Sequence, residues 1–582
     1  MFADTGPFVL FDDARGSDAS PARLYRDPVR ILTTDDPAAV PDLLGQIGGE
    51  DGHWAGFITY EAGHALESGL TPATRLAALP LLWFGEFAGY HEIDAAEVAA
   101  HLPDPVGGWI GAPRPEIDHT AYADALARVQ ALITAGDIYQ ANLTFQNEVS
   151  TAGYPLAIYA GLRGRAKAGY GGVVWTGSDW FLSLSPELFF ALHDGKITTK
   201  PMKGTAARHR DKAADDNAID QLRTDPKQRA ENLMIVDLLR NDLSRVAVSG
   251  SVAVPHLFSV ETYPTVHQMT STVIAKLRSG LGAVDVLRTI FPCGSITGAP
   301  KIRAMEVIGE TETAPRGLYT GSIGRIDPNG DAAFNVAIRT LHLPNGADQA
   351  RLGLGSGIVS DSRLGEEWAE CLEKGRFVAD PRRFDLIETM RFEPEYGIAL
   401  LDRHLDRMKA SARALDFAFD RHAARNELQA ATFSQTDPRR IRLMLSRNGN
   451  LAIEVGPLHA MPIEPVGVAI TALPVSSDDF RLRHKTSDRR FYDAARKRAG
   501  MFEVLFADPD GFLTEGSFTN LFVKRGDILL TPPLARGLLP GVLRTEMISG
   551  CKAEEGDLRA EDLADGFWIG NASRGLIAAR LG

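Results

Sequence analysis

Two acid-rich segments of the sequence have the side chains of a site for a divalent cation. Glu231 lies among apolar residues in ENLMIVDLL, and the segment GEEWAECLEKG places Glu366, Glu367, Glu370 and Lys374 on one face if it is helical. A buried carboxylate is costly unless it is paired or metal-bound. Carboxylate oxygens without nearby Cys or His suit Mg²⁺. The spacing alone favours a cap or arginine partner for Glu231 and a solvated face for the second segment, since charged helix faces are usually solvated.

The surrounding pattern predicts the elements that position these acids. Residues 119–135 have apolar positions at three- and four-residue spacing, which predicts an amphipathic helix. Residues 226–246 predict a long helix that carries Glu231 and begins near Pro226. Short apolar runs between 170 and 205 predict a series of strands before that helix.

A polar stretch at 375–385, broken by Pro381, separates a helix that ends near Lys374 from a new strand. A chain of 582 residues is too long for one hydrophobic core. We therefore predict two domains, 1–380 and 381–582.

Composition narrows the class of protein. The net charge of −13 argues against nucleic-acid or membrane-surface binding, because phosphate-rich partners need a basic face. Cys293, Cys371 and Cys551 fit no metal or redox spacing, which favours free thiols. Since neither a signal peptide nor a long apolar run occurs, we expect a cytoplasmic protein.

Eight motifs between residues 183 and 374 follow the order of a known family. They are SLSPELFF, TKPMKGTAARHRD, AENLMIVDLLRNDLSRV, YPTVHQMTSTV, FPCGSITGAPKIRAMEVI, RGLYTGSIG, FNVAIRT and GLGSGIVSDS with EEWAECLEK. This order resembles the chorismate-utilising enzymes, which include anthranilate synthase, aminodeoxychorismate synthase component I and the isochorismate and salicylate synthases. The resemblance implies an α+β fold, with a large β-sandwich covered by helices.

The same resemblance assigns roles within the first domain. It implies that Glu231 and Glu370 bind Mg²⁺, which holds the ring carboxylate of chorismate. Arg339 would grip the pyruvyl carboxylate, a group that suits a guanidinium, aided by backbone amides at Gly355 and Gly357. The other matching residues, for substrate contact or as the active-site histidine, are Ser295, Tyr319, Lys374 and His267.

Lys203 in PMKGT discriminates among these relatives. Anthranilate synthases resemble PIAGT at this place, whereas aminodeoxychorismate synthases resemble PIKGT. The lysine implies covalent catalysis, in which its amine attacks C2 of the ring while the hydroxyl leaves from C4. Ammonia then attacks C4 and expels the lysine. Glu187 matches the general acid that protonates the departing hydroxyl. Taken alone, Lys203 is equally a surface lysine beside a turn at Gly204.

The segment after residue 386 carries a second set of motifs. FDLIETMRF, DRHLDRMKASARAL, HKTSDRRFYDAARKR, FLTEGSFTNLFV, GLLPGVLRTEM and WIGNASRG resemble the class IV pyridoxal-phosphate fold. That family includes branched-chain and D-amino-acid aminotransferases and aminodeoxychorismate lyase. The resemblance implies a smaller α+β domain that binds pyridoxal 5′-phosphate.

Within this domain, Lys485 matches the Schiff-base lysine and Glu515 matches the carboxylate that keeps the pyridine nitrogen protonated. The other matches, which hold the phosphate or pack on the ring, are Arg407, the amides of Val542 and Leu543, and Leu539. The segment is short for this fold and lacks the strand that usually precedes LIETMRF. Either its small subdomain is trimmed or the first domain supplies the strand. Thr389 and Arg391 are candidate pocket residues.

Together the motifs predict a bifunctional route to p-aminobenzoate for folate, through amination of chorismate and elimination of pyruvate. The alternatives are an anthranilate- or isochorismate-type synthase joined to a branched-chain or D-amino-acid aminotransferase, and a non-enzymatic assembly subunit. Because no glutaminase motif occurs, a separate glutamine amidotransferase or free ammonia must supply nitrogen. We expect no nucleic-acid or membrane partner, and a homodimer through the second domain.

Overall fold

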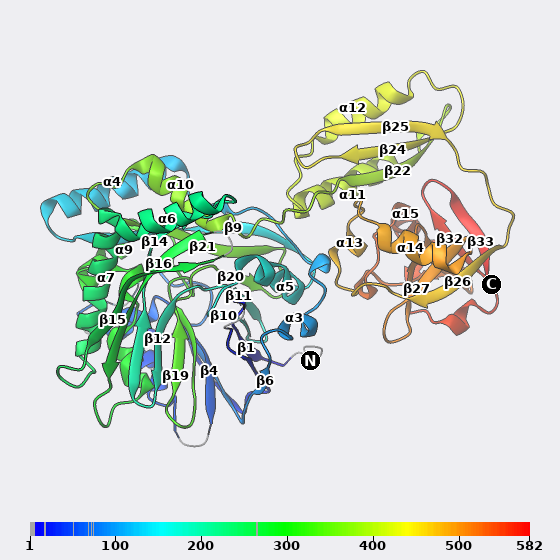
Figure 1. The fold of residues 1–582 in the computed structure, drawn as a ribbon. Coiled ribbons are helices and arrows are strands. Elements are labelled where there is room, and N and C mark those ends of the chain that lie inside the picture. Colours follow the sequence, from blue (N-terminus) through cyan, green and yellow to red (C-terminus); the bar gives the residue numbers. More distant parts are fainter. Residues whose placement is uncertain are drawn as a thin grey trace. The chain divides into compact units, whose positions relative to one another are not determined.

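The structure is a computed structural model that describes two compact units. The described residues are 6–16, 19–49, 52–67, 69–71, 73, 75–263 and 266–582. The first unit comprises Met1–Pro103, Ala112–Val149 and Tyr159–Ala379, and the second comprises Asp104–Gly111, Ser150–Ile158 and Asp380–Gly582. Figure 1 colours the chain from blue at the N-terminus to red at the C-terminus, so most of the second unit is yellow to red and its two early segments are blue and cyan.

Two antiparallel sheets build the first unit. One sheet has the strand order β17-β9-β21-β20-β11-β10-β1-β2-β6, and the other has the order β14-β16-β13-β12-β19-β18-β4-β5-β3. The strands of the first sheet are β1 (Phe8–Asp12), β2 (Ala22–Arg26), β6 (His91–Ile93), β9 (Gln140–Ala152), β10 (Gly171–Trp175), β11 (Asp179–Ser183), β17 (Gly298–Ala299), β20 (Thr340–Pro344) and β21 (Gln349–Ile358), with β8 (Arg114–Pro115) beside β9. Those of the second are β3 (Arg30–Thr34), β4 (His53–Ile58), β5 (Leu82–Phe87), β12 (Leu188–His193), β13 (Lys196–Lys200), β14 (Met202–Ala207), β16 (Val266–Lys276), β18 (Ser322–Ile326) and β19 (Ala332–Asn335), with β15 (Ala253–Thr262) beside β16.

The two sheets face each other across an apolar core. Val9 and Phe181 of the first sheet pack in one cluster with Phe57 and Trp83 of the second, and the rings of Phe57 and Phe181 are 4.8 Å apart between centroids. Alternate residues along each strand point to this core, as in a β-sandwich. The mixed α and β fold with a sandwich is the class that the sequence predicted.

Helices pack against both sheets of this unit. The helices of this unit are α1 (Val40–Leu44), α2 (Ala62–Leu66), α3 (Val98–His101), α4 (His119–Ala135), α5 (Pro155–Ala166, which runs on from the second unit), α6 (Lys212–Thr224), α7 (Pro226–Ser244), α8 (Ala283–Ile290), α9 (Lys301–Thr311) and α10 (Leu364–Gly375). The predicted helices at 119–135 and 226–246 are confirmed as α4 and α7, and α7 starts after the cap residue Asp225. Leu239 and Leu243 of α7 join the core beneath β12, and α7 runs along β14 and β16 (Figure 1). Among the described residues, none of the helices has the length and apolar character to cross a membrane.

The second unit contains two further sheets. The smaller, in the order β23-β22-β24-β25, consists of β22 (Leu386–Glu393), β23 (Gly397–Ile398), β24 (Arg439–Leu445) and β25 (Leu451–Pro457), with the helices α11 (Leu401–Ala414) and α12 (Arg421–Thr432). The larger, in the order β28-β27-β26-β33-β32-β29-β30-β31, consists of β26 (Val466–Ala472), β27 (Glu503–Ala507), β28 (Leu513–Gly516), β29 (Asn520–Arg525), β30 (Ile528–Thr531), β31 (Ala553–Glu555), β32 (Phe567–Asn571) and β33 (Gly575–Leu581). Its helices are α13 (Phe480–Arg483), α14 (Arg490–Ala499) and α15 (Val542–Ser549).

Two short segments from the earlier part of the chain belong to the second unit. Residues 104–111 carry β7 (Trp109–Ile110), which pairs with the end of β9 so that Trp109 lies opposite Ala152. Trp109 is 1% exposed and packs with Phe384 and Leu415 in the core of the smaller sheet. Among the described strands, β7 pairs with β9 and not with the smaller sheet. The segment therefore adds a side chain to the core of the second unit, but it does not replace the strand that usually precedes LIETMRF.

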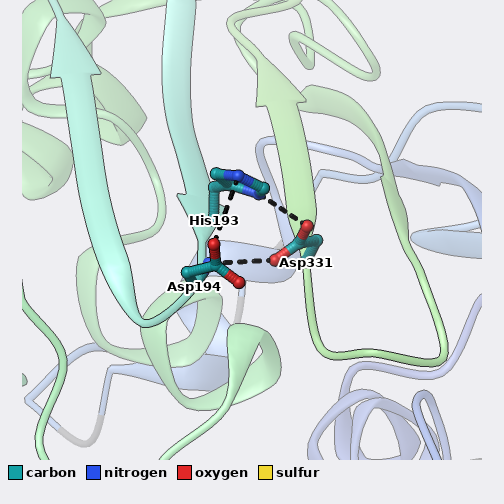
Figure 2. A group of neighbouring side chains, drawn as sticks. All are labelled: His193, Asp194 and Asp331. Atoms are coloured by element: carbon teal, nitrogen blue, oxygen red, sulfur yellow. Dashed lines mark hydrogen bonds and ion pairs between the residues drawn. The ribbon is translucent and has the colours of Figure 1, made fainter.

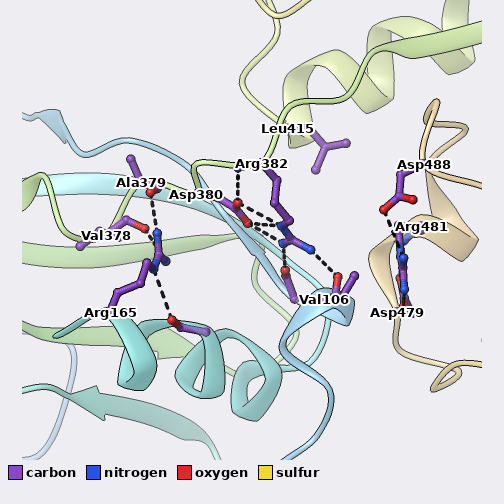
Figure 3. A network of polar contacts seen from close by, with 12 residues as sticks. Val106, Arg165, Val378, Ala379, Asp380, Arg382, Leu415, Asp479, Arg481 and Asp488 are labelled. Atoms are coloured by element: carbon purple, nitrogen blue, oxygen red, sulfur yellow. Dashed lines mark hydrogen bonds and ion pairs between the residues drawn. The ribbon is translucent and has the colours of Figure 1, made fainter. Parts of the chain in front are cut away.

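Arginines fix the backbone around these segments. Arg382 donates to the Asp380 carboxylate at 2.9 Å and to the carbonyl of Val106 at 2.6 Å, as Figure 3 shows. In the same view Arg481 is held between the carboxylates of Asp479 and Asp488, at 2.6 and 3.2 Å. Charge-assisted pairs of this kind keep buried guanidinium groups satisfied.

Replacing Trp109 by alanine should therefore destabilise the second unit, although residue 109 lies far from it in sequence. Loss of a fully buried tryptophan typically costs about 3–5 kcal/mol of the free energy of unfolding. Urea denaturation followed by hydrogen exchange in β22 and β24 measures the effect. Tyr396→Ala is the control, because Tyr396 is 85% exposed. Equal unfolding of both variants and the parent chain would contradict the assignment of this segment.

Candidate active sites

A buried carboxyl and a serine form one side of the first candidate site. Glu187 precedes β12, and the Ser295 hydroxyl donates to its Oε1 at 2.7 Å. Burial raises the pKa of Glu187 to about 7, against the Ser295 hydrogen bond and the positive charge of Lys203. Glu187 is therefore placed to carry a proton at neutral pH.

The Lys203 amine lies beside this carboxyl, on β14. A Cβ atom built on Gly357 would be 2.8 Å from Lys203 Nζ, so the amine lies close against the backbone of this glycine. Burial lowers the pKa of Lys203, with the charge of Lys374 acting in the same direction and Glu231 opposing it. Both effects favour a neutral amine, the nucleophilic form.

The predicted metal ligands lie on two helices that approach this lysine. Burial raises the pKa of Glu231 on α7, and the charges of Glu370 and Glu367 on α10 add to the shift. Among the described residues Glu231 has no hydrogen-bond or ion-pair partner, whereas Glu370 holds Lys374 at 2.6 Å. A half-buried, unpartnered carboxylate facing a second acidic helix fits a divalent cation bound through oxygen. The Lys374 amine also donates to the carbonyl of Gly355 at 3.0 Å.

Two predicted substrate contacts, Arg339 and Tyr319, lie just before the strands β20 and β18. Arg339 is half-buried, has a positive φ of 51° and lies 5.7 Å from the Phe377 ring centroid. In the described part of the chain its guanidinium has no carboxylate partner, which leaves it available to an anion. The Tyr319 ring packs on Gly353, where an added Cβ would be 2.1 Å from the ring. Roles for both residues stay predictions.

His267 lies in a separate polar network. Its ring nitrogens contact Asp215 at 2.9 Å and Thr262 at 3.0 Å, and its side chain is fully buried. The neighbouring residue, Gln268, is the one that reaches the backbone beside Lys203, with its amide 2.9 Å from the carbonyl of Gly204. A catalytic role for His267 stays a prediction, and residues 264–265 of its motif lie outside the described residues.

Two polar residues that the sequence did not point to, Gln140 and Asn142, also reach the first site. Gln140 Nε2 and Asn142 Oδ1 lie 2.7 and 3.0 Å from the Cβ position at Gly357, on the same side as the Lys203 amine. In the described structure Gln140 is buried and neither end of its amide has a hydrogen-bond partner. Buried polar groups left unpaired in this way fit a site that is completed by a ligand. Their spacing of two on β9 is the signal that could have found them.

Among the described residues, one group of His and Asp side chains lies close enough together to hold a metal. His193 and Asp194 lie at the turn between β12 and β13, and Asp331 directly precedes the neighbouring strand β19, with its carboxylate 2.7 Å from His193 Nδ1 (Figure 2). The hydrogen bond to Asp331 raises the pKa of His193. His193 and Asp194 are exposed, and the histidine forms ion pairs with both acids. We therefore interpret the cluster as a surface ion-pair network.

The second candidate site is built around Lys485, which follows α13. The backbone carbonyl of Lys485 accepts from the amide of Ile387, which fixes the residue at the end of β22. Burial lowers the pKa of Lys485 to about 7, and the positive charges of Arg407, Arg489 and Arg442 add to this. A buried neutral amine among cations fits a lysine that bonds an anionic carbonyl cofactor.

Glu515 on β28 is the acid of this site. The Tyr492 hydroxyl donates to its Oε1 at 2.5 Å, and burial raises the pKa of Glu515 to about 7. The loop after it is shaped by a second buried acid, Glu503, which accepts from the Ser517 hydroxyl at 2.5 Å and from the Thr519 hydroxyl at 2.9 Å. The Arg489 guanidinium lies 4.4 Å from the Tyr492 ring centroid. An acid with a pKa of about 7 fits the predicted partner of the pyridine nitrogen of pyridoxal phosphate.

Arg407 on α11 is held by a buried carboxylate and a backbone carbonyl. It donates two hydrogen bonds to Glu388, at 2.8 and 2.6 Å, and a third to the carbonyl of Pro540 at 3.1 Å. His404 contacts the same carboxylate at 2.6 Å. Burial acts to raise the pKa of Glu388, but Arg407 and His404 hold it well below its ordinary value. Neither Glu388 nor His404 was singled out from the sequence, and both fix the direction of Arg407.

The predicted helix start at Val542 is confirmed, since α15 begins there without a side-chain cap. A Cβ on Gly541 would lie 1.7 Å from Asn520 Oδ1, so the turn before the helix requires glycine. Leu539 is buried, and its carbonyl accepts from the Gly541 amide at 2.8 Å. Free amides at a helix start, with Arg407 close to Pro540, fit a phosphate.

The two candidate pocket residues lie on β22. Thr389 pairs in register with Arg442 of β24, so both side chains share one face of the smaller sheet. Arg391 on the same face is paired with Glu393 at 2.5 Å. Contact of Thr389 and Arg391 with a substrate stays a prediction.

Comparison with known proteins finds a different family for each of the two parts of the chain. Residues 15–380 match the chorismate binding enzyme family and residues 385–581 match the amino-transferase class IV family. Aminodeoxychorismate synthase component 1 from Salmonella typhimurium is 36% identical over 380 residues, covering 61% of this chain and 82% of that protein. Its namesake from Bacillus subtilis is 34% identical over 375 residues, covering 63% and 74%.

A solved structure gives the same result for the fold. Anthranilate synthase component I from Streptococcus pneumoniae superposes with a TM-score of 0.54 at 26% identity, over 62% of this chain and 93% of its own. The chain therefore belongs to the chorismate binding enzyme family, and its C-terminal third matches the amino-transferase class IV family.

Proposed function

We propose that this chain makes p-aminobenzoate in two steps, with residues 1–380 aminating chorismate and residues 381–582 removing pyruvate from the product. The observation that carries the proposal is the Lys203 amine, which lies against Gly357 in a site that also holds the acid Glu187. Relatives named aminodeoxychorismate synthase component 1 support the first step. The class IV match, with the half-buried Lys485 and the buried Glu515 in the matched segment, supports the second.

In the first step the Lys203 amine would attack C2 of the chorismate ring while the C4 hydroxyl leaves. Glu187 would give that hydroxyl its proton, so that water departs. Ammonia would then attack C4 and expel the lysine, which leaves 4-amino-4-deoxychorismate and a free Lys203. Mg²⁺, held by Glu231 and Glu370, would neutralise the ring carboxylate that would otherwise repel both acids. Arg339 would bind the pyruvyl carboxylate.

The proposed acid role of Glu187 makes the first step sensitive to pH. A carboxyl whose pKa is raised to about 7 is protonated below that pH and loses the proton as the pH rises through it. The rate of amination, measured at a fixed concentration of neutral ammonia, should therefore fall above about pH 7. Glu187→Gln should lose this descending limb and be slower by roughly 10²–10⁴-fold. An unchanged profile in the variant would show that another group titrates.

In the second step this chain's residues would hold the aminated intermediate and move its protons. Pyridoxal phosphate, when bound, supplies a ring that takes up electrons from the substrate. Glu515 would share a proton with the ring nitrogen, while Arg407 and the amides of Val542 and Leu543 would hold the phosphate. Lys485 would carry the proton whose removal makes the ring aromatic as pyruvate departs.

The relatives are named as component 1 of a synthase, which supports a separate glutamine amidotransferase as the nitrogen source. Three free cysteines suit the reducing cytosol, where we place the protein. We keep the homodimer through the second domain as part of the proposal.

Product identification tests the proposal directly. The full chain is incubated with chorismate, ammonia, Mg²⁺ and pyridoxal phosphate, and the products are separated by chromatography. The proposal expects p-aminobenzoate and pyruvate in equal amounts. Anthranilate or isochorismate as the product would favour the alternative synthase, and amino-group exchange between amino acids and keto acids would favour an aminotransferase.

A further inference from the structure

The strand that carries Lys203 has a β-bulge at that residue. Met202 of β14 lies opposite Thr270 of β16, and Thr205 lies opposite Gln268, so three residue steps on β14 match two on β16. The extra residue falls at Lys203–Gly204, where Gly204 has a φ of +100°. A bulge of this kind changes the direction of a side chain and leaves backbone groups outside the regular ladder.

Side-chain amides take up the backbone groups that the bulge frees. Gln268 Nε2 donates to the carbonyl of Gly204 at 2.9 Å, and Gln268 Oε1 accepts from the Thr205 hydroxyl at 3.0 Å. Asn232 of α7 donates to the carbonyl of Lys203 at 3.4 Å and is held in turn by the Ser271 hydroxyl at 2.6 Å. The backbone on both sides of the lysine is therefore tied to neighbouring elements.

The backbone conformation of the bulge at Gly204 is closely restricted. A Cβ on Gly204 would lie 2.9 Å from the side chain of Gln228 on α7, and its positive φ also disfavours other residues. Gln268 makes two of the contacts at the bulge, one on each side of the Gly204–Thr205 peptide. It is thus the side chain whose loss frees the turn most.

We propose that Gln268 is a positioning residue for the first reaction, which holds the bulge so that the Lys203 amine stays beside Gly357. The inference rests on the proposed function, in which that amine attacks the ring. Attack requires the reacting atoms to be held near contact distance, and a displacement of about 1 Å can cost about 10²-fold in rate. Gln268 itself does not touch the reacting atoms.

The test uses the full chain and follows the two stages of the first reaction separately. Chorismate without ammonia gives the rate at which Lys203 is modified, read by intact-protein mass spectrometry. Chorismate with ammonia gives kcat and KM. Gln268→Leu should slow both the modification and kcat by about 10²-fold, with KM for chorismate within about threefold of the parent.

A matched pair at Thr205 supplies the control and remains informative if Gln268→Leu folds poorly. Thr205 is exposed, and serine keeps the hydroxyl that binds Gln268, whereas valine keeps the shape and removes it. Thr205→Ser should behave as the parent, and Thr205→Val should lower kcat by about tenfold with KM unchanged.

The outcomes separate the two claims. Equal kcat for Gln268→Leu and the parent, or a raised KM with unchanged kcat, overturns the positioning role. So does an equal loss in both Thr205 variants. Failure of the parent chain itself to make 4-amino-4-deoxychorismate overturns the proposed function instead.

Discussion

Replacing Lys203 by methionine should abolish the formation of 4-amino-4-deoxychorismate, with a loss of at least about 10³-fold. Methionine keeps an unbranched apolar stem but offers no amine, so the variant separates the nucleophile from the packing. Hydroxide is a poor leaving group, and without the lysine a single ammonia molecule must displace it directly. The measurement is the rate of chorismate consumption with saturating ammonia and Mg²⁺.

Lys196→Met is the matched control, since Lys196 is exposed on strand β13 of the same sheet and the variant should keep full activity. In addition, the parent chain should gain the mass of dehydrated chorismate when ammonia is withheld, and Lys203→Met should not. Full aminating activity in Lys203→Met would rule out the covalent route.

The elements around this lysine could largely be read from the sequence, because local patterns determine them. The apolar spacing of residues 119–135 and the start at Pro226 correspond to α4 and α7. Strands between 170 and 205 follow from short apolar runs bounded by turns. Such signals depend on neighbours within one or two turns of chain, which a sequence displays directly.

The direction of individual side chains was harder to predict. His267 and Gln268 are adjacent on β16, so they point to opposite faces, and a motif that names a histidine does not say which of the two faces Lys203. In the structure Gln268 contacts the Gly204 carbonyl, and His267 contacts Asp215. The bulge that sets this register depends on pairing between β14 and β16, which are far apart in sequence.

Contacts between residues that are far apart in the sequence could not be predicted for a related reason. Nothing local marks Trp109 as a core residue of a unit whose main segment begins at Asp380. Glu388 and His404 also look unremarkable until the fold brings them to Arg407. Each of these residues is buried against a partner from a distant part of the chain. The free-energy cost of burying it without that partner cannot be judged until the fold shows which partner it has.

Replacing Lys485 by alanine should stop p-aminobenzoate formation while amination continues, so that 4-amino-4-deoxychorismate accumulates. Since burial lowers the pKa of Lys485 to about 7, its amine is neutral above that pH, whereas an ordinary lysine stays charged. The parent chain should therefore take up pyridoxal phosphate faster as the pH rises through about 7, read from the visible absorbance of the lysine-bound cofactor.

The alanine variant should show no such absorbance band at any pH, and Lys497→Ala, at an exposed position of α14, should behave as the parent. Mixing Lys203→Met with Lys485→Ala should restore p-aminobenzoate, because each chain keeps the site that the other lacks. Restoration requires the aminated intermediate to leave one chain and enter another. A p-aminobenzoate yield from Lys485→Ala alone that equals the parent's would remove the lyase assignment, whatever the mixture does.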